Sequence, residues 1–166
     1  MSRDISTSGH STAGASPPFI ATFLGRLWRK IGRDDLGPVD FRALERSETP
    51  NDALAATPGS LAPGASVDFA LPRYALAPEA LIDRVERRVT AVAPNARLVE
   101  RKLDGLRYVT RSPSMRFPDT TVIEAVALPD GATGLCAYAR ASLGRSDFGK
   151  NRQRLRAWLA EMPVED

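Results

Sequence analysis

Residues 96–112, ARLVERKLDGLRYVTRS, decide the fold class of this chain. Asp104 and Gly105 form a dipeptide that two-residue hairpin turns prefer, because both central residues of such a turn need positive φ angles. The runs on either side contain valine, tyrosine and threonine, which favour strands. The stretch therefore predicts two antiparallel strands joined by a tight turn.

Further strands are expected on both sides of this hairpin. Residues 66–72, SVDFALP, alternate apolar and polar side chains, which predicts a strand before it. Residues 120–128, TTVIEAVAL, and residues 135–142, LCAYARAS, favour two strands after it. The PDGATG segment between those two runs favours a turn, so they are expected to pair as neighbours.

Two helices complete the pattern. Residues 77–92, APEALIDRVERRVTAV, place Pro78 at a first helical position and repeat apolar side chains at helical spacing. A last helix is expected to begin near Ser146 or Asp147, since either residue suits an N-cap. Its apolar side carries Phe148, Leu155, Trp158, Leu159 and Met162.

The expected order of elements is β-α-β-β-β-β-α. An antiparallel meander with both helices packed on one face would bury each apolar set. This α+β arrangement matches the TATA-binding-protein-like and helix-grip-like architecture. The match is an analogy of topology and by itself carries no function.

The remaining residues are expected to surround this core. The chain length of 166 residues favours one domain with appendages. Residues 1–18 are small and polar, which predicts a disordered tail. Residues 34–65 are rich in proline, glycine, aspartate and alanine without periodicity, which predicts an irregular surface segment. The α+β core domain is then expected to span residues 66–166.

Residues 19–33, FIATFLGRLWRKIGR, predict a basic amphipathic helix. Apolar side chains recur at four-residue steps, and the cations gather toward the C-terminal half without an intervening acid. Such a helix can lie in the interface of an anionic membrane. It can equally dock on the protein's own core or on a partner, which is the commoner use of the pattern. The residues expected to contact a membrane are Phe19, Phe23, Leu27, Trp28, Arg29 and Lys30.

Composition argues against several classes of function. The formal net charge of +3 is small, and the basic last helix lacks interleaved aromatic residues, which argues against nucleic-acid binding. The one cysteine excludes an intrachain disulfide, and the one histidine, His10, lies in the polar tail. We expect neither a metal nor a cofactor. Without a membrane-spanning run or a secretory signal, the expected location is the cytoplasm, with association at the membrane surface through residues 19–33.

The stretch 140–159, RASLGRSDFGKNRQRLRAWL, concentrates charged side chains where the last strand runs into the last helix. Asp147, Asn151 and Arg154 would share one stripe of that helix. Arg140, on the same strand face as Cys136 and Tyr138, is expected to reach back to Asp147. We interpret Arg140, Asp147, Asn151 and Arg154 as a structural polar cluster that fastens the helix to the sheet.

A binding role for this cluster is the alternative. Arg140, Arg145 and Arg154 could face an anion near the helix N-terminus, although Asp147 would occupy the place of that anion. Asp119 follows a proline and is expected to serve a turn rather than acid–base chemistry. Cys136 is expected to fill the core. We therefore assign no catalytic residue.

The chain also resembles a known family. The segments RSPSMRFPDT at 111–120, AYARASLGRSDFGKNRQRLRAWL at 137–159 and PNDALAATPG at 50–59 resemble proteobacterial members of the domain-of-unknown-function family 1499, DUF1499. The departures are Ala56, in a region where cysteines are expected, and Ala139 and Ala141, which replace a Ser-Arg-Ser pattern. The resemblance implies no activity. It does imply that an apolar N-terminal segment is common among relatives.

These observations favour a small non-enzymatic α+β module. It is expected to bind a protein partner or an apolar small ligand, and to be peripheral to a membrane through residues 19–33. A helix-grip-like sheet can leave a ligand cavity beneath its helix. The alternative is an enzyme that uses the Asp, Arg and Asn side chains around Asp147.

Overall fold

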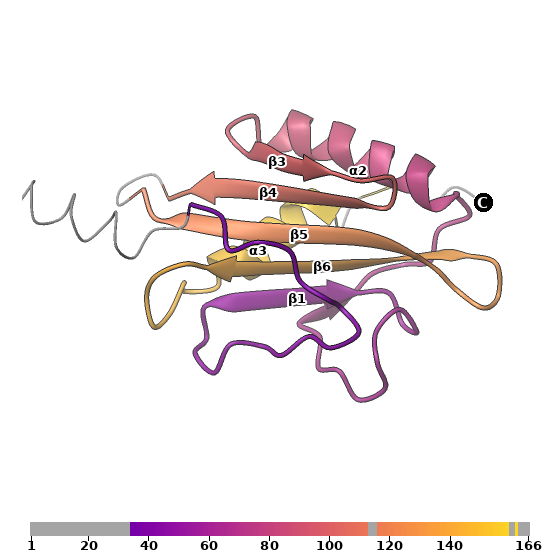
Figure 1. The fold of residues 1–166 in the computed structure, drawn as a ribbon, viewed down its shortest axis with the longest axis horizontal. Helices are drawn as coiled ribbons and strands as arrows, with labels where there is room; N and C mark the ends of the chain where they lie inside the picture. Colours follow the sequence, from indigo (N-terminus) through magenta and orange to yellow (C-terminus); the bar gives the residue numbers. More distant parts are fainter. Residues whose placement is uncertain (1–33, 113–115, 160–161, 163–166) are drawn as a thin grey trace, which may run out of the picture. The chain divides into compact units, whose positions relative to one another are not determined.

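The computed structural model describes residues 34–112, 116–159 and 162. The predicted tail at 1–18 and the predicted amphipathic helix at 19–33 lie outside these residues. The described chain is an α+β domain with a mostly antiparallel sheet and two helices (Figure 1), as predicted, although the sheet has six strands where five were expected. Its elements are β1 (Asp52–Ala56), β2 (Phe69–Ala70), α2 (Pro78–Val92), β3 (Arg97–Arg101), β4 (Gly105–Arg111), β5 (Pro118–Ala127), β6 (Thr133–Ala141) and α3 (Lys150–Leu159).

The predicted hairpin is present as β3 and β4, which pair antiparallel. Its connection spans residues 102–104, because Gly105 is already the first residue of β4, and neither Asp104 nor Gly105 has the positive φ angle of the predicted two-residue turn. The strands follow the order β2-β1-β6-β5-β4-β3 across the sheet. Each neighbouring pair is antiparallel except β1 with β2, which are parallel. Strands β3 to β6 therefore form the expected meander, because each is joined to the next by a short connection.

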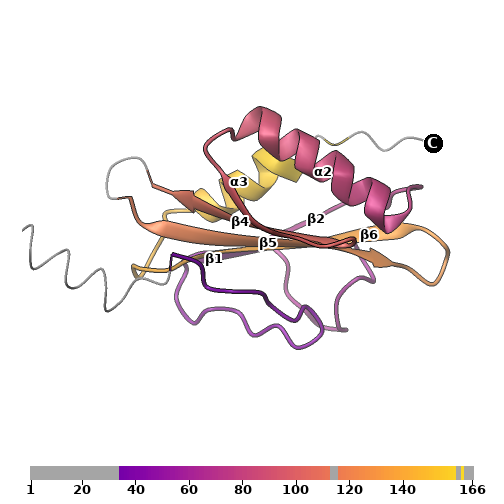
Figure 2. The same cartoon turned by 45° about the horizontal axis from the view of Figure 1, so that its top comes forward.

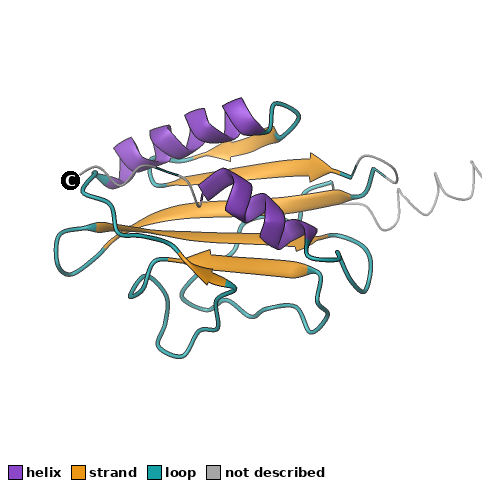
Figure 3. Cartoon of the chain, turned by 180° about the vertical axis from the view of Figure 1, so that it is seen from behind, coloured by secondary structure: helices purple, strands orange, loops and turns teal. Residues whose placement is uncertain are grey.

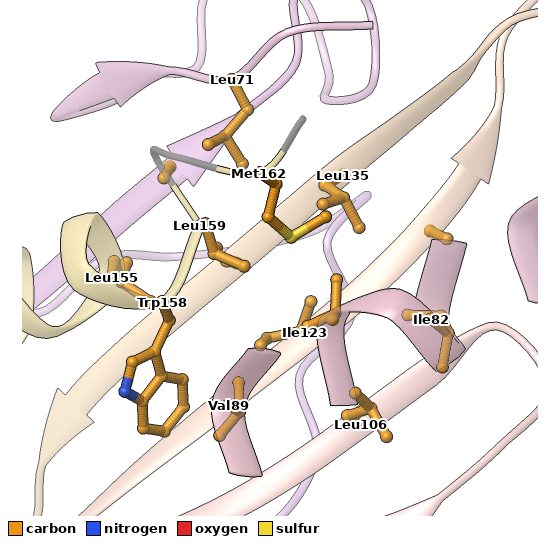
Figure 4. Packing of buried hydrophobic residues seen from close by; sticks show 14 of the residues in the cluster. Leu71, Ile82, Val89, Leu106, Ile123, Leu135, Leu155, Trp158, Leu159 and Met162 are labelled. Atoms are coloured by element: carbon orange, nitrogen blue, oxygen red, sulfur yellow. The ribbon is translucent and has the colours of Figure 1, made fainter. Parts of the chain in front are cut away.

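Both helices cover one face of the sheet (Figures 2 and 3). Helix α2 begins at Pro78, as predicted, and buries Leu81, Ile82, Val85 and Val89. Helix α3 buries Leu155, Trp158 and Leu159 against the same core, and Figure 4 shows their side chains meeting those of the sheet. Among the described helices, none has the length and apolar character of a membrane span.

Residues 52–56, which the sequence analysis places in an irregular segment, instead form β1. This strand lies between β6 and β2, and only Phe69 and Ala70 of the predicted strand at 66–72 belong to β2. The sequence of β1 is DALAA, whose alanines give little β-propensity and no alternation of bulky side chains. Tertiary burial determines the conformation of β1, because Ala53 and Ala55 are fully buried.

The alanines form a floor of small side chains beneath α3. Ala53 pairs with Ala139 and Ala55 pairs with Ala137 across β1 and β6, and all four are 0% exposed. They belong to the helix-side core, and α3 packs on both of these strands. Small side chains let a helix backbone approach a sheet closely, so this alanine floor determines how near α3 can lie.

The opposite face has its own, smaller core. Leu54, Cys136 and Tyr138 point to this side together with Phe41. The segment from residue 34 to residue 46 and the loop after β1 run across it, on the side of the sheet away from the helices (Figure 2). Leu36 is tied to the sheet because its N–H donates to the Thr120 hydroxyl at 2.9 Å. The sheet is therefore covered on both faces.

Enlarging the alanine floor should loosen α3. We expect Ala139→Leu to lower the free energy of unfolding by about 1–3 kcal/mol, because added methylene groups in a filled core force backbone shifts. Chemical denaturation measures this change. The matched control is Ala127→Leu at the exposed end of β5, which should change stability by less than about 0.5 kcal/mol. Equal effects of the two substitutions would contradict this packing.

Candidate functional site

Polar side chains gather at one end of the sheet, which we call the polar end. Here β4 ends at Arg111, β5 begins at Pro118 and β6 ends at Ala141, and these residues are neighbours in the strand register. The β6–α3 connection leaves from the same end. The opposite end, which we call the hairpin end, carries the β3–β4 and β5–β6 turns (Figure 1).

Asn51 connects most of the segments that meet at the polar end. Its backbone carbonyl accepts hydrogen bonds from the Ala141 N–H and from the Asn151 side-chain amide, both at 2.9 Å. Its own side-chain amide donates to the Gly144 carbonyl at 2.8 Å. One buried residue before β1 thus holds the end of β6, the loop after it and the first turn of α3. Asn51 follows Pro50, which favours a turn or a short helix cap, and it was not predicted to join the polar cluster.

Asn151 and Arg154 extend this network across the sheet to β5. The Asn151 side chain is fully buried, and its Oδ1 accepts a hydrogen bond from Arg154 Nη1. Arg154 Nη2 lies 2.7 Å from Asp119 Oδ2, and these two side chains are only 15% and 10% exposed. Asp119 therefore binds the last helix, rather than serving the local turn that the sequence predicts.

Asp147 caps α3. Its Oδ2 accepts the Asn151 N–H at 2.7 Å, and its Oδ1 accepts the Gly149 N–H at 2.9 Å. These bonds satisfy backbone donors that the first helical turn leaves without intrahelical partners. Helix α3 begins at Lys150, three residues after the predicted N-cap, but Asp147 still accepts N–H groups at its start. Because both carboxylate oxygens accept backbone N–H groups, this side chain is oriented toward the helix.

Arg140 lies on the other face of the sheet from α3. The strand alternation that places Arg140 with Cys136 and Tyr138 was correctly inferred, but the helices cover the opposite face. The Arg140 guanidinium donates instead to the carbonyls of Leu36 and Gly37, at 2.8 and 3.1 Å. The predicted contact between Arg140 and Asp147 is therefore wrong, and the alternative in which Arg140 and Arg154 face one anion is not supported, because the two side chains lie on opposite faces of the sheet.

A second polar cluster, on the face away from the helices, was not predicted. Arg46 forms ion pairs with Asp52 at 2.7 Å and with Asp68 at 2.9 Å. Tyr138 donates its hydroxyl to Asp52 at 2.7 Å, and the Ser47 N–H donates to the same carboxylate at 3.0 Å. Arg46, Ser47 and Asp52 are close in the sequence, whereas Asp68 and Tyr138 come from distant segments, and no motif links the five residues. Asp52 itself lies at the start of the unpredicted strand.

The environment of this second cluster determines its charges. Burial alone would raise the pKa of Asp52, but hydrogen bonds from Arg46, Tyr138 and Ser47 outweigh it and lower that pKa below its ordinary value. The hydrogen bond to Asp52 raises the pKa of Arg46. Burial raises the pKa of Tyr138 to about 12, so its hydroxyl stays protonated and can donate. The cluster is a charged structural pair with a neutral tyrosine donor.

Cys136 behaves as the core-filling residue that the sequence predicts. It is 0% exposed, and its Sγ lies 3.1 Å from the Ser60 hydroxyl. Burial raises the pKa of this thiol to about 11, so it is not a thiolate at neutral pH. Among residues 34–112, 116–159 and 162, no three His, Cys, Asp or Glu side chains are grouped closely enough to hold a metal ion.

The space between α3 and the sheet is filled by side chains. Leu155 and Leu159 are fully buried there (Figure 4), and the rings of Tyr108 and Trp158 meet edge to face with centroids 5.4 Å apart. Hollows are found elsewhere on the domain. One of them has a volume of about 240 Å³ and lies on the face of the sheet away from the helices. Its lining residues include Val39, Glu100, Lys102, Arg107 and Glu124.

The site and the fold together describe a small α+β domain whose last helix is clamped to its sheet by buried polar groups. The model of DUF1499, a protein family of unknown function, matches residues 44–162, which is more than half of the chain. The chain belongs to this family. A search of curated proteins finds no match.

Breaking the ion pair beneath α3 should destabilise the domain. We expect Arg154→Ala to cost about 3 kcal/mol, because Asp119 would stay buried without its partner. Arg152→Ala, an exposed change on the same helix, should cost less than about 0.5 kcal/mol. In a double-mutant cycle with Asp119→Ala, the double variant should lose less stability than the sum of the single losses. Strict additivity would show that the two side chains do not interact.

The lowered pKa of Asp52 predicts a specific acid response. A carboxyl group with a folded pKa below its unfolded value contributes stability above the unfolded value, and that contribution is lost as the pH falls through the folded value. The unfolded value is near 3.8. The stability gap between the parent and Asp52→Asn should therefore shrink as the pH falls from about 6 to about 2. Glu48→Gln, an exposed change in the same segment, should show a much smaller gap. A gap independent of pH would refute this assignment.

Proposed function

We propose that this protein is a non-enzymatic module that binds the surface of an anionic membrane. The non-enzymatic part of the proposal rests on one observation: the candidate reactive side chains are used in structural contacts. Asp147 caps α3, Asn151 holds Asn51, and Arg154 pairs with Asp119. A catalytic group has to be free to touch a substrate. The alternative, an enzyme built around Asp147, gains no support from this geometry.

The filled core also favours binding at a surface over enclosure of a small apolar ligand. Leu155, Trp158 and Leu159 occupy the space beneath α3 in which a helix-grip-like domain would hold such a ligand. The meander β3 to β6 with both helices on one face supports our proposal of a TATA-binding-protein-like or helix-grip-like architecture. That architecture leaves the function to be argued from surfaces.

The membrane is favoured over a protein partner because of the sequence of residues 19–33. This segment combines aromatic and aliphatic side chains with Arg26, Arg29, Lys30 and Arg33, and it contains no acid. Apolar side chains and cations together are what binding to an anionic interface requires. We propose this segment as the principal membrane contact of the chain, at the inner, cytoplasmic surface of a membrane.

Flotation with lipid vesicles tests this proposal. The intact chain should float with phosphatidylglycerol–phosphatidylcholine vesicles and much less with phosphatidylcholine alone, and added salt should weaken the binding. A variant lacking residues 19–33 should lose most of the flotation, and Arg29→Glu with Lys30→Glu should lose a large part of it. Flotation of neither protein, or equal flotation of the intact chain and the deletion variant, would contradict the proposal. A protein partner bound through residues 19–33 would then be the remaining hypothesis.

A further inference from the structure

We propose that the β6–α3 loop is a second membrane contact, with Phe148 entering the interface and Arg145 and Lys150 binding anionic headgroups. The proposal rests on the proposed function, and it goes further by assigning the residues that orient the domain. We call Arg145, Phe148 and Lys150 the loop patch. The patch lies at the polar end of the sheet, where β6 runs into α3 (Figure 1).

Phe148 is held out in solvent by its backbone. It is 89% exposed, the highest fraction among the exposed large hydrophobic residues of the described chain. Its φ angle is 55°, in the left-handed region that bulky side chains rarely adopt. The last helix was predicted to bury Phe148 on its apolar side, and this is wrong because α3 begins only at Lys150. An exposed residue in a strained conformation suggests a role beyond packing.

The loop that presents Phe148 is fastened on both sides. Asp147 accepts the N–H groups of Gly149 and Asn151, and the Gly144 carbonyl accepts the Asn51 side chain. The Phe148 N–H donates to the Ser146 hydroxyl at 3.1 Å. An aromatic side chain on an ordered loop loses little conformational freedom when it enters an interface, so more of its burial contributes to binding.

The charge of the loop patch complements an anionic surface. Arg145 and Lys150 are exposed on either side of Phe148, and neither forms an ion pair within the described part of the chain. Arg116, in the β4–β5 connection at the same end, is also exposed. Each cation close to an anionic bilayer strengthens binding by about fivefold. Phenylalanine between cations therefore suits a lipid interface, which offers hydrocarbon just beneath its phosphates.

Residues 19–33 directly precede, in the sequence, a residue that lies at the polar end. Asp34, the first described residue, pairs with Arg111 at the end of β4, with Arg111 Nη2 and Asp34 Oδ2 2.5 Å apart. Arg33, the last residue of the proposed principal contact, is one peptide unit from Asp34, which spans about 3.8 Å between Cα atoms. The first described residue after the proposed principal contact therefore lies at the polar end of the sheet, which also carries the loop patch.

The hairpin end supplies matched controls. Leu103 is 67% exposed in the β3–β4 turn, and Lys102 beside it is also exposed. Asp104 follows them, just as Asp147 lies between Arg145 and Phe148 at the polar end, so the two ends are comparable in this respect. Leu103→Ala and Lys102→Glu therefore remove an exposed apolar side chain and reverse one exposed cation without touching the polar end.

Vesicle binding by the full chain tests the loop patch. With phosphatidylglycerol–phosphatidylcholine vesicles, Phe148→Ala should weaken binding by roughly tenfold, from the loss of one buried aromatic side chain. Lys150→Glu should weaken it by tenfold or more, since the charge changes by two units. Leu103→Ala and Lys102→Glu should bind within about twofold of the parent. All four variants should keep the thermal unfolding midpoint of the parent, which confirms that they are folded.

A fluorescent label reports the orientation directly. Cys136 is buried, so Phe148→Cys or Leu103→Cys can be labelled selectively with an environment-sensitive dye. On anionic vesicles the emission of the label at position 148 should shift to the blue, and that of the label at 103 should not. Loss of binding on deleting residues 19–33, with the Phe148 and Lys150 variants equal to their controls and no shift at 148, overturns the loop contact and leaves the proposed function standing. Absence of binding by the intact chain overturns both.

Discussion

The structure depends on the way the first turn of α3 is fixed to the end of the sheet by Asn51. A single backbone carbonyl there accepts one bond from β6 and one from the buried Asn151 side chain. A buried side-chain amide without a hydrogen-bond partner would lower the free energy of unfolding by about 1–3 kcal/mol, so the pairing of Asn151 with Asn51 is strongly favoured. Their pairing determines where α3 begins, and the loop before it is shaped by the same contacts. The exposed position of Phe148 follows from them.

The two faces of the sheet are stabilised by different means. On the helix side, alanines of β1 and β6 provide a flat floor, and the bulk of the core is supplied by α2, α3 and the larger side chains of β4 and β5. On the other side, an irregular segment covers the sheet, held by Arg140 at the carbonyls of Leu36 and Gly37 and by the Arg46–Asp52 pair. Irregular backbone has few partners of its own, so side chains of the sheet supply them.

The sequence allowed the meander and both helices to be predicted, because turn dipeptides and apolar periodicity are local signals. The hairpin of β3 and β4 and the helix starting at Pro78 belong to this class. Strand β1 could not be predicted this way, since Ala53 and Ala55 allow α3 to pack closely but contribute little strand propensity. With β1 the sheet has six strands where five were predicted, and residues of the expected surface segment lie in its interior.

The candidate site was predicted in part, for a related reason. Asp147, Asn151 and Arg154 share one helix, so their spacing revealed their common side. Alternation along the strand also showed which residues share a face of β6 with Arg140. It could not show which face the helices cover, because that depends on tertiary packing. Asn51 and Asp119 could not be assigned, because their partners lie 100 and 35 positions away in the chain. Contacts at that separation leave no pattern in one sequence.

The central claim is that Asn151 clamps α3 to the sheet through Asn51, and that the polar cluster is structural. Native-state hydrogen exchange of the Asn151→Leu variant tests it most directly, because exchange reports stability element by element. The account predicts that the amides of α3 and of residues 142–149 lose protection, while those of the β3–β4 hairpin retain more of it. Unchanged protection of α3 in the variant would contradict the claim.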